Sequence, residues 1–133
     1  MERDDSITHF LNVDLHIYSR SNLRPLVDAF GKNVIDLHID RVGRLYWVLL
    51  EVSADAGTVD ATIRKFCRLI RALAPTQRRL WNKATRRDFN IGIQSDVEGN
   101  TFHVEAETVK AAAAVGARIV ITVYGTRLLE PSS

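Results

Sequence analysis

A four-residue motif containing aspartate and histidine occurs twice in the sequence. Asp14 and His16 belong to the first copy, Asp-Leu-His-Ile, and Asp36 and His38 belong to the second. Both copies lie where apolar and polar residues alternate, which predicts strands and places each Asp and its His on one strand face. Imidazole nitrogens and carboxylate oxygens are ligands of zinc and manganese, so these four side chains are candidate metal ligands.

The expected order of the strands separates the two copies. In the arrangement we predict, the strand that contains Trp47 and Val48 lies between them, and neighbouring strands are about 4.8 Å apart. The copies would then stand roughly 9.5 Å apart, whereas zinc ligands lie about 2 Å from their metal. A polar outer face of the sheet is therefore the preferred interpretation, and we predict no cofactor. A metal-dependent enzyme is kept as an alternative.

Basic residues are concentrated in the middle of the chain. Residues 64–87 contain nine basic and no acidic residues, whereas the other nine basic and sixteen acidic residues give the rest of the chain a net charge of −7. This segregation favours binding to a phosphate backbone, with Trp81 stacking on a base, or to an acidic protein surface. The preferred interpretation of the segment itself is nevertheless a solvated helix face whose arginines pair with Glu51, Asp55 or Asp88, because no known nucleic-acid motif is present. The candidate binding residues are Arg64, Lys65, Arg68, Arg71, Arg78, Arg79, Trp81, Lys83, Arg86 and Arg87.

The sequence contains no familiar catalytic signature. Cys67 is the only cysteine, and it falls on the apolar stripe of a predicted helix, so we expect a buried and protonated thiol. No serine lies in a nucleophile elbow, and the glycines form neither a phosphate-binding loop nor a dinucleotide fingerprint. We therefore assign no catalytic residue.

Length and composition predict one globular domain. The chain has 133 residues, of which 46% are hydrophobic and 26% charged, and we expect fraying of the first 8 and about the last 8 residues. Its polar N-terminus lacks the apolar core of a secretory signal, and its apolar runs are shorter than the ~20 residues of a membrane-spanning helix. One cysteine cannot form an intrachain disulfide, which favours a reducing compartment. We expect a cytoplasmic protein that does not associate with membranes.

The periodicity of the apolar residues predicts alternating strands and helices. The apolar run at 45–52 predicts a central strand buried on both faces, with Trp47 in the core. Ser21 is the expected N-cap of the first helix, and Pro75 is expected to end the long helix that Gly57 and Thr58 begin. Strands are expected at 10–18, 33–40, 45–52, 89–93, 101–104 and 119–123, helices at 22–30, 58–74 and 106–115, a helix or turn at 76–84, and turns at 41–44 and 98–100.

This order of elements predicts an α+β fold. The first six elements match a ferredoxin-like split βαβ sandwich, with a mostly antiparallel sheet and helices on one face. A C-terminal β-α-β extension follows.

The same order resembles a bacterial family. Tyr46 and Trp47 begin a strand that is followed by an amphipathic helix, and the chain closes with an alanine-rich helix and a strand that ends in Ile-Thr-Val-Tyr at 121–124. From about Leu11 to Gly125 this is similar to the family catalogued as domain of unknown function 4279. The resemblance implies an α+β sandwich, no established activity and no catalytic residues to transfer.

These observations favour binding over catalysis. We predict a non-enzymatic protein-binding module. One concrete form is an immunity protein that covers the surface of a toxin, because small stand-alone bacterial proteins of this kind often resemble immunity proteins. Nucleic-acid binding through residues 64–87 and a metal-dependent enzyme are the alternatives. An unpaired edge strand is also compatible with a homodimer.

Overall fold

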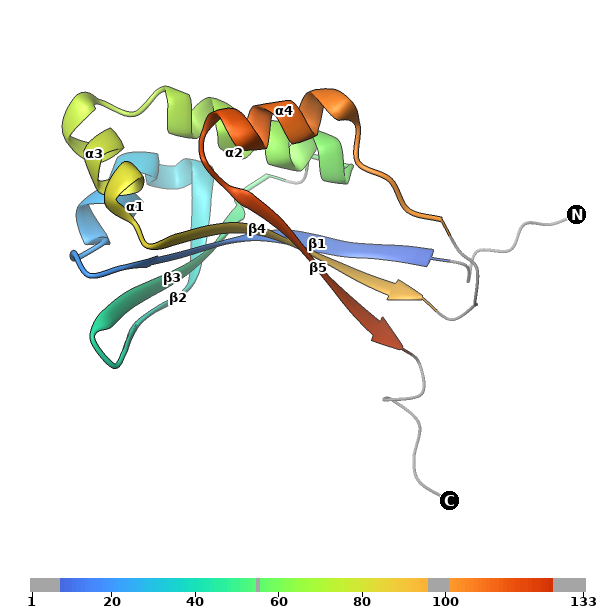
Figure 1. The fold of residues 1–133 in the computed structure, drawn as a ribbon, viewed down its shortest axis with the longest axis horizontal. Coiled ribbons are helices and arrows are strands. Elements are labelled where there is room, and N and C mark those ends of the chain that lie inside the picture. The colour runs from blue at the N-terminus through green and yellow to red at the C-terminus, as the bar shows by residue number, and fades with distance from the viewer. Residues whose placement is uncertain (1–7, 55, 96–100, 126–133) are drawn as a thin grey trace, which may run out of the picture.

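The computed structural model describes residues 8–54, 56–95 and 101–125 (Figure 1). Within these residues the chain forms one mixed five-stranded sheet and four α-helices, which confirms the α+β class. The strands are β1 (Thr8–Ser19), β2 (Val34–Val42), β3 (Leu45–Val52), β4 (Arg86–Ser95) and β5 (Arg118–Gly125). The helices are α1 (Arg24–Phe30), α2 (Val59–Arg71), α3 (Pro75–Lys83) and α4 (Ala106–Ala114), and the short 3-10 helix η1 (Gly31–Asn33) follows α1.

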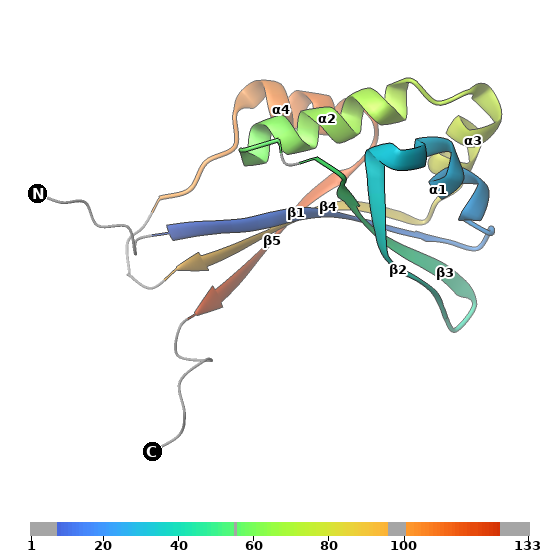
Figure 2. The same cartoon turned by 180° about the vertical axis from the view of Figure 1, so that it is seen from behind.

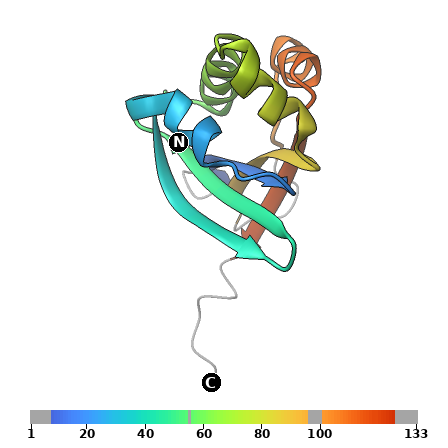
Figure 3. The ribbon, with the colours of Figure 1, turned by 90° about the vertical axis from the view of Figure 1, so that its left-hand side faces the viewer.

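The sheet has the strand order β2-β3-β1-β4-β5. The central strand β1 is antiparallel to both β3 and β4, and β2 is antiparallel to β3. The edge strand β5 is parallel to β4. All four helices lie on one side of this twisted sheet (Figures 1, 2 and 3). No helix among the described residues is long and apolar enough to cross a membrane.

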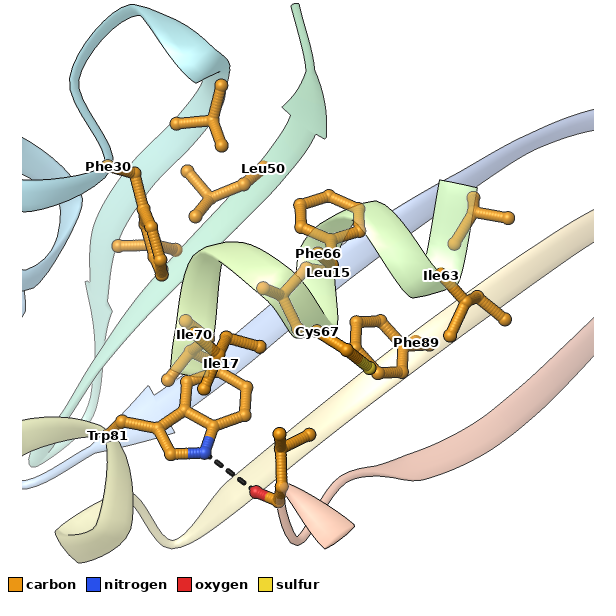
Figure 4. Packing of buried hydrophobic residues seen from close by; sticks show 14 of the residues in the cluster. Leu15, Ile17, Phe30, Leu50, Ile63, Phe66, Cys67, Ile70, Trp81 and Phe89 are labelled. Carbon is orange, nitrogen blue, oxygen red and sulfur yellow. Dashed lines mark hydrogen bonds between the residues drawn. The ribbon is translucent and has the colours of Figure 1, made fainter. Parts of the chain in front are cut away.

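Alternation along β1 sets the two faces of the sheet. Val13, Leu15 and Ile17 are buried against the helices, as the period of two predicts. They pack with Leu50 of β3 and Phe89 of β4 in one apolar core (Figure 4). The intervening side chains of β1 must therefore point to the opposite face of the sheet.

The helix α2 covers the middle of the sheet. Thr58 is its N-cap, because the Thr58 Oγ1 accepts a hydrogen bond of 3.0 Å from the Ala61 N–H. The predicted apolar stripe is confirmed, since Phe66, Cys67 and Ile70 are fully buried (Figure 4). Burial also raises the pKa of the Cys67 thiol, so its sulfur is a core atom in its protonated form.

One glycine provides the backbone conformation of the turn between β2 and β3. Gly43 has a φ of 62°, and no non-glycine residue in the described part of the chain has a positive φ. A two-residue turn with positive φ only at its first position is the type II′ turn, which matches the twist of paired strands. The predicted turn at 41–44 is thus confirmed.

Several predicted boundaries are wrong. Ser21 is not the N-cap of α1, which begins at Arg24, where the N–H donates to the Asn22 Oδ1 at 2.9 Å. Pro75 does not end α2 but begins α3, where its missing N–H removes no helical hydrogen bond. Residues 101–105 form no strand, so the C-terminal extension consists of α4 and β5.

Some predictions fall on residues that are not described. The turn at 98–100 lies outside the described residues, and so do nearly all the positions expected to be frayed.

The strand β3 is not buried on both faces. Val48 and Leu50 are fully buried against the helices, whereas Trp47 and Leu49 on the other face are only half-buried. Trp47 is therefore not the core residue that its apolar neighbours predicted.

Candidate functional site

The sheet face opposite the helices is covered by no helix among the described residues (Figures 1 and 3). We call it the open sheet face. Strand pairing arranges its side chains in rows that run across the strands. One row contains Asp40, Trp47, Tyr18 and Arg86, and the next contains His38, Leu49, His16, Asp88 and Arg118.

Four side chains of these two rows contact one another in a line. The Tyr18 and Trp47 rings are stacked, whereas the His38 ring is tilted by 46° to that of Trp47. The rings of Tyr18 and Trp47 have centroids 5.9 Å apart and an interplanar angle of 10°. The Arg86 guanidinium lies 4.8 Å from the centroid of the Tyr18 ring, and the His38 ring lies 4.5 Å from that of Trp47. We call this group, in spatial order His38, Trp47, Tyr18 and Arg86, the stacked row. Tyr18 and Trp47 each have a neighbour on both sides.

An ion-pair network centred on a buried aspartate fixes the basic end of the stacked row. The Asp88 side chain is only 3% exposed and accepts hydrogen bonds from the Arg86 Nε at 2.8 Å and from the Arg118 Nε at 2.8 Å. The Arg118 Nη2 donates a further bond of 3.0 Å. Burial alone would raise the pKa of Asp88, but the hydrogen bonds from Arg118 and Arg86 outweigh it and lower that pKa. Asp88 is therefore ionised at neutral pH and orients both guanidinium groups.

A carboxyl group lies in the middle of the open sheet face. Burial, reinforced by the charge of Glu51, raises the pKa of Asp14 to about 6. The Asp14 Oδ1 is buried and has no hydrogen-bond partner among the described residues. The neighbouring Glu51 accepts a hydrogen bond of 2.9 Å from the Asn12 Nδ2.

A neutral imidazole lies beside Asp14. Burial, assisted by Arg86 and opposed by Asp88, lowers the pKa of His16. Its Nδ1 accepts a hydrogen bond of 3.4 Å from the Trp47 Nε1. The indole of Trp47 is thus held by a hydrogen bond as well as by stacking.

The four candidate metal ligands do not converge. A β-bulge between Asp36 and His38 breaks the alternation of β2, so the prediction that these two side chains share a face is wrong. Asp36 lies on the helix side, 3.7 Å from the Arg24 Nη1. His16 and His38 lie on the open sheet face with Trp47 between them. Among the described residues no group of three or more His, Cys, Asp or Glu side chains has the geometry to hold a metal ion.

Trp81 is not available for stacking on a base. Its side chain is 0% exposed, and its Nε1 donates a hydrogen bond of 2.8 Å to the Val115 carbonyl (Figure 4). The hydrogen bond of Trp81 therefore connects α3 to the C-terminal end of α4.

Arg87 also has a structural role. Its Nη1 donates to the carbonyls of Trp81 at 3.0 Å and Ala84 at 2.9 Å, and its Nε donates to the Gly116 carbonyl at 3.0 Å. Its guanidinium thus ties the C-terminal end of α3 to the turn that leads into β5.

The remaining basic residues are divided between the two sides of the molecule. Arg86 lies on the open sheet face, while the others belong to the helix layer. The predicted ten-residue site is therefore not one patch. The helix-layer members are Arg64, Lys65, Arg68 and Arg71 on α2 and Arg78, Arg79 and Lys83 on α3.

A hollow on the helix side is lined by charged residues that form ion pairs with one another. It has a volume of about 400 Å³ and lies between α1 and β2. Its charged lining residues pair with one another, because the Arg24 Nη1 lies 4.0 Å from the Asp28 Oδ1 and 3.7 Å from the Asp36 Oδ2.

Sequence reasoning missed several of the residues that meet on the open sheet face. Tyr18, Asp88 and Arg118 were not singled out as a site, although Tyr18 continues the alternation that starts at Asp14. A comparison of the polar positions of all five strands after pairing would have found them.

No protein-family model, curated protein or solved structure matches this chain. The resemblance to the domain of unknown function 4279 family therefore stays a prediction, and function must be argued from geometry.

Proposed function

We propose that the chain is a non-enzymatic module that binds a partner protein through the open sheet face. The stacked row is the observation that carries this proposal. Tryptophan, tyrosine and arginine are the residues most enriched among those that dominate the energy of protein interfaces. Here Trp47, Tyr18 and Arg86 are in contact and aligned on the open sheet face.

The stacked row is organised before a partner arrives. Trp47 is held by His16 and by two ring neighbours, and Arg86 is held by Asp88. Side chains that are already ordered lose little conformational entropy on binding, so more of the contact energy appears as affinity.

Apolar side chains at the adjoining edge extend this surface. Ile35, Leu37 and Val42 of β2 are 45%, 46% and 52% exposed. A polar rim around partly apolar anchors is typical of protein interfaces. Carboxylates at Asp14 and Asp40 and guanidinium groups at Arg86 and Arg118 give the partner both signs of charge to complement.

The stacked row favours a protein over a nucleobase on this face. RNA-binding sheets stack bases on exposed ring faces. Tyr18 and Trp47 each already contact a side chain on either side, which leaves less room for a base to stack between them.

We further propose that the first six elements are a ferredoxin-like split βαβ unit to which α4 and β5 are added. The support is that β1-α1-β2 and β3-α2-β4 interleave in the antiparallel order β2-β3-β1-β4. An experimental structure in which another strand separates β1 from β3 would contradict this assignment.

Immunity to a toxin is one concrete form of the proposal. In that form, expression of the chain protects cells from a toxin encoded beside it, and Trp47→Ala removes the protection. An unchanged toxin effect in the presence of the wild-type chain would exclude this form while leaving other protein partners open.

The experiment that tests the proposal is a measurement of partner affinity. A protein captured with the wild-type chain is purified and titrated by calorimetry with wild type, Trp47→Ala and Trp47→Phe. Loss of an interface anchor of about 2 kcal/mol weakens binding about 30-fold, so we expect at least this loss for Trp47→Ala and a smaller loss for Trp47→Phe.

The matched control is Arg79→Ala, which truncates an exposed side chain on the helix side. It should bind as wild type does, and circular dichroism should report the same fold for all variants. Equal affinity of Trp47→Ala and wild type would refute the open sheet face as the binding surface.

A further inference from the structure

The helix side of the molecule carries a second feature, which the open sheet face does not explain. We define the basic helix face as Arg64, Lys65, Arg68 and Arg71 of α2 with Arg78, Arg79 and Lys83 of α3. Five of its members are exposed to solvent, namely Arg64, Arg68, Arg71, Arg79 and Lys83.

Helical spacing aligns these charges. Arg64, Arg68 and Arg71 are separated by four and three residues, so they share the side of α2 opposite its buried stripe. With a rise of 1.5 Å per residue, they span about 10 Å along the helix axis. Arg79 and Lys83 are four residues apart on α3 and form a similar, shorter line.

These cations have no acidic partners in the described part of the chain. The described arginines that form ion pairs are Arg24, Arg86 and Arg118, and none belongs to the basic helix face. Arg64 instead contacts the Asp60 carbonyl at 3.4 Å, and Arg78 contacts the Asn82 Oδ1 at 3.4 Å. Among the described residues, the interpretation in which acids neutralise this segment therefore holds for Arg86 alone. A cluster of uncompensated positive charge attracts polyanions.

The basic helix face has no apolar anchor for a protein partner. The exposed large hydrophobic residues of the described chain lie on β2, α4 and β5, and none lies on α2 or α3. Trp81 is buried, so no aromatic ring of α3 is available for base stacking either. Such a surface fits a ligand whose binding energy comes from regularly spaced negative charge. Duplex nucleic acid supplies about one phosphate charge per 1.7 Å of its axis.

From this charge complementarity we infer that the basic helix face binds the phosphate backbone of double-stranded nucleic acid, independently of base sequence. This goes beyond the proposed protein-binding function, because it uses the other side of the molecule. If the five exposed cations each neutralise one phosphate, the logarithm of affinity falls with the logarithm of salt concentration with a slope of about −4.5. Affinity then drops about 500-fold between 50 and 200 mM salt.

The test is fluorescence anisotropy with the full chain and fluorescein-labelled 20-base-pair DNA duplexes of two unrelated sequences. Both duplexes should bind equally, with the steep salt dependence stated above. Arg68→Gln combined with Arg71→Gln removes two phosphate contacts, so it should weaken binding and make the slope less steep by about 1.8. Far-UV circular dichroism reports whether α2 is intact.

The matched control is Arg20→Gln combined with Arg44→Gln, which changes net charge equally at exposed positions off α2 and α3. This control should retain the wild-type slope. Trp47→Ala should bind DNA as wild type does, which separates this inference from the proposed function. The inference is overturned if the chain does not bind DNA, if binding does not depend on salt, or if both double variants lose the same affinity. Equally tight binding of polyglutamate would also overturn it, in favour of an acidic protein partner.

Discussion

Replacing Asp14 by asparagine should stabilise the protein at neutral pH. Burial and the charge of Glu51 raise the pKa of Asp14 from 3.8 to about 6 in the folded state. As pH rises from about 4 to 6, the unfolded chain releases this proton while the folded chain still holds it, so the free energy of unfolding falls across that window. Above pH 6 the folded protein contains an ionised carboxylate whose Oδ1 has no hydrogen-bond partner among the described residues.

The size of the effect follows from the shift in pKa. Each pKa unit corresponds to about 1.36 kcal/mol, which gives an upper bound of about 3 kcal/mol for Asp14. Asp14 is only half-buried, so solvent screening reduces the expected value to about 1–2 kcal/mol. Asparagine has nearly the same shape and no charge. Asp14→Asn should therefore raise the free energy of unfolding by about 1–2 kcal/mol at pH 8 and change it little at pH 4.

Urea unfolding followed by tryptophan fluorescence measures this difference at the two pH values. Glu107→Gln is the control, because Glu107 is an exposed carboxylate on α4, and it should change stability by less than about 0.5 kcal/mol at either pH. The reasoning is refuted if Asp14→Asn brings no gain at pH 8, or the same gain at pH 4. A carboxylate that is kept at a cost in stability on an uncovered face is expected at a binding surface.

Two further substitutions test the contacts that position the two sides of the molecule. Asp88→Asn should destabilise the fold by about 2 kcal/mol at pH 7, because it weakens charge-assisted hydrogen bonds from Arg86 and Arg118. Since the pKa of Asp88 is lowered, this contribution is present above about pH 4 and is lost as pH falls through the folded-state value. In urea unfolding, the difference between wild type and variant should therefore shrink as pH falls below about 4, and a constant difference would contradict it. Trp81→Phe should lower the free energy of unfolding by about 2 kcal/mol, because it leaves a cavity and removes the hydrogen bond to the Val115 carbonyl. An unchanged midpoint in thermal unfolding would show that other contacts hold α3.

Local periodicity was sufficient to predict much of this fold. The alternation at Val13, Leu15 and Ile17 identified both the strand and its buried face. The helical spacing of Phe66, Cys67 and Ile70 identified the buried side of α2 in the same way. These patterns are visible in sequence because one element buries one face against a core.

The features that sequence could not supply depend on pairing between elements. The β-bulge between Asp36 and His38 places these two side chains on different faces of the sheet, although the repeated motif predicts one face. The sequence of the repeat contains no signal for the bulge. Trp47 was expected in the core because its neighbours are apolar, but strand pairing places it beside Tyr18 on the open sheet face. Arg87 was grouped with the charged binding residues, whereas its carbonyl partners become neighbours only after folding.

The central claim is that a partner protein contacts the open sheet face, and the two tryptophans provide a direct test. Trp47 lies on that face, whereas Trp81 is buried between the sheet and the helices, so their indole N–H resonances report on different regions. In a ¹⁵N correlation spectrum titrated with the purified partner, with resonances assigned by Trp47→Phe, we expect the Trp47 indole signal to shift or broaden while that of Trp81 stays in place. A complex that forms without any change at Trp47, and with changes confined to amides of α2 and α3, would contradict the account.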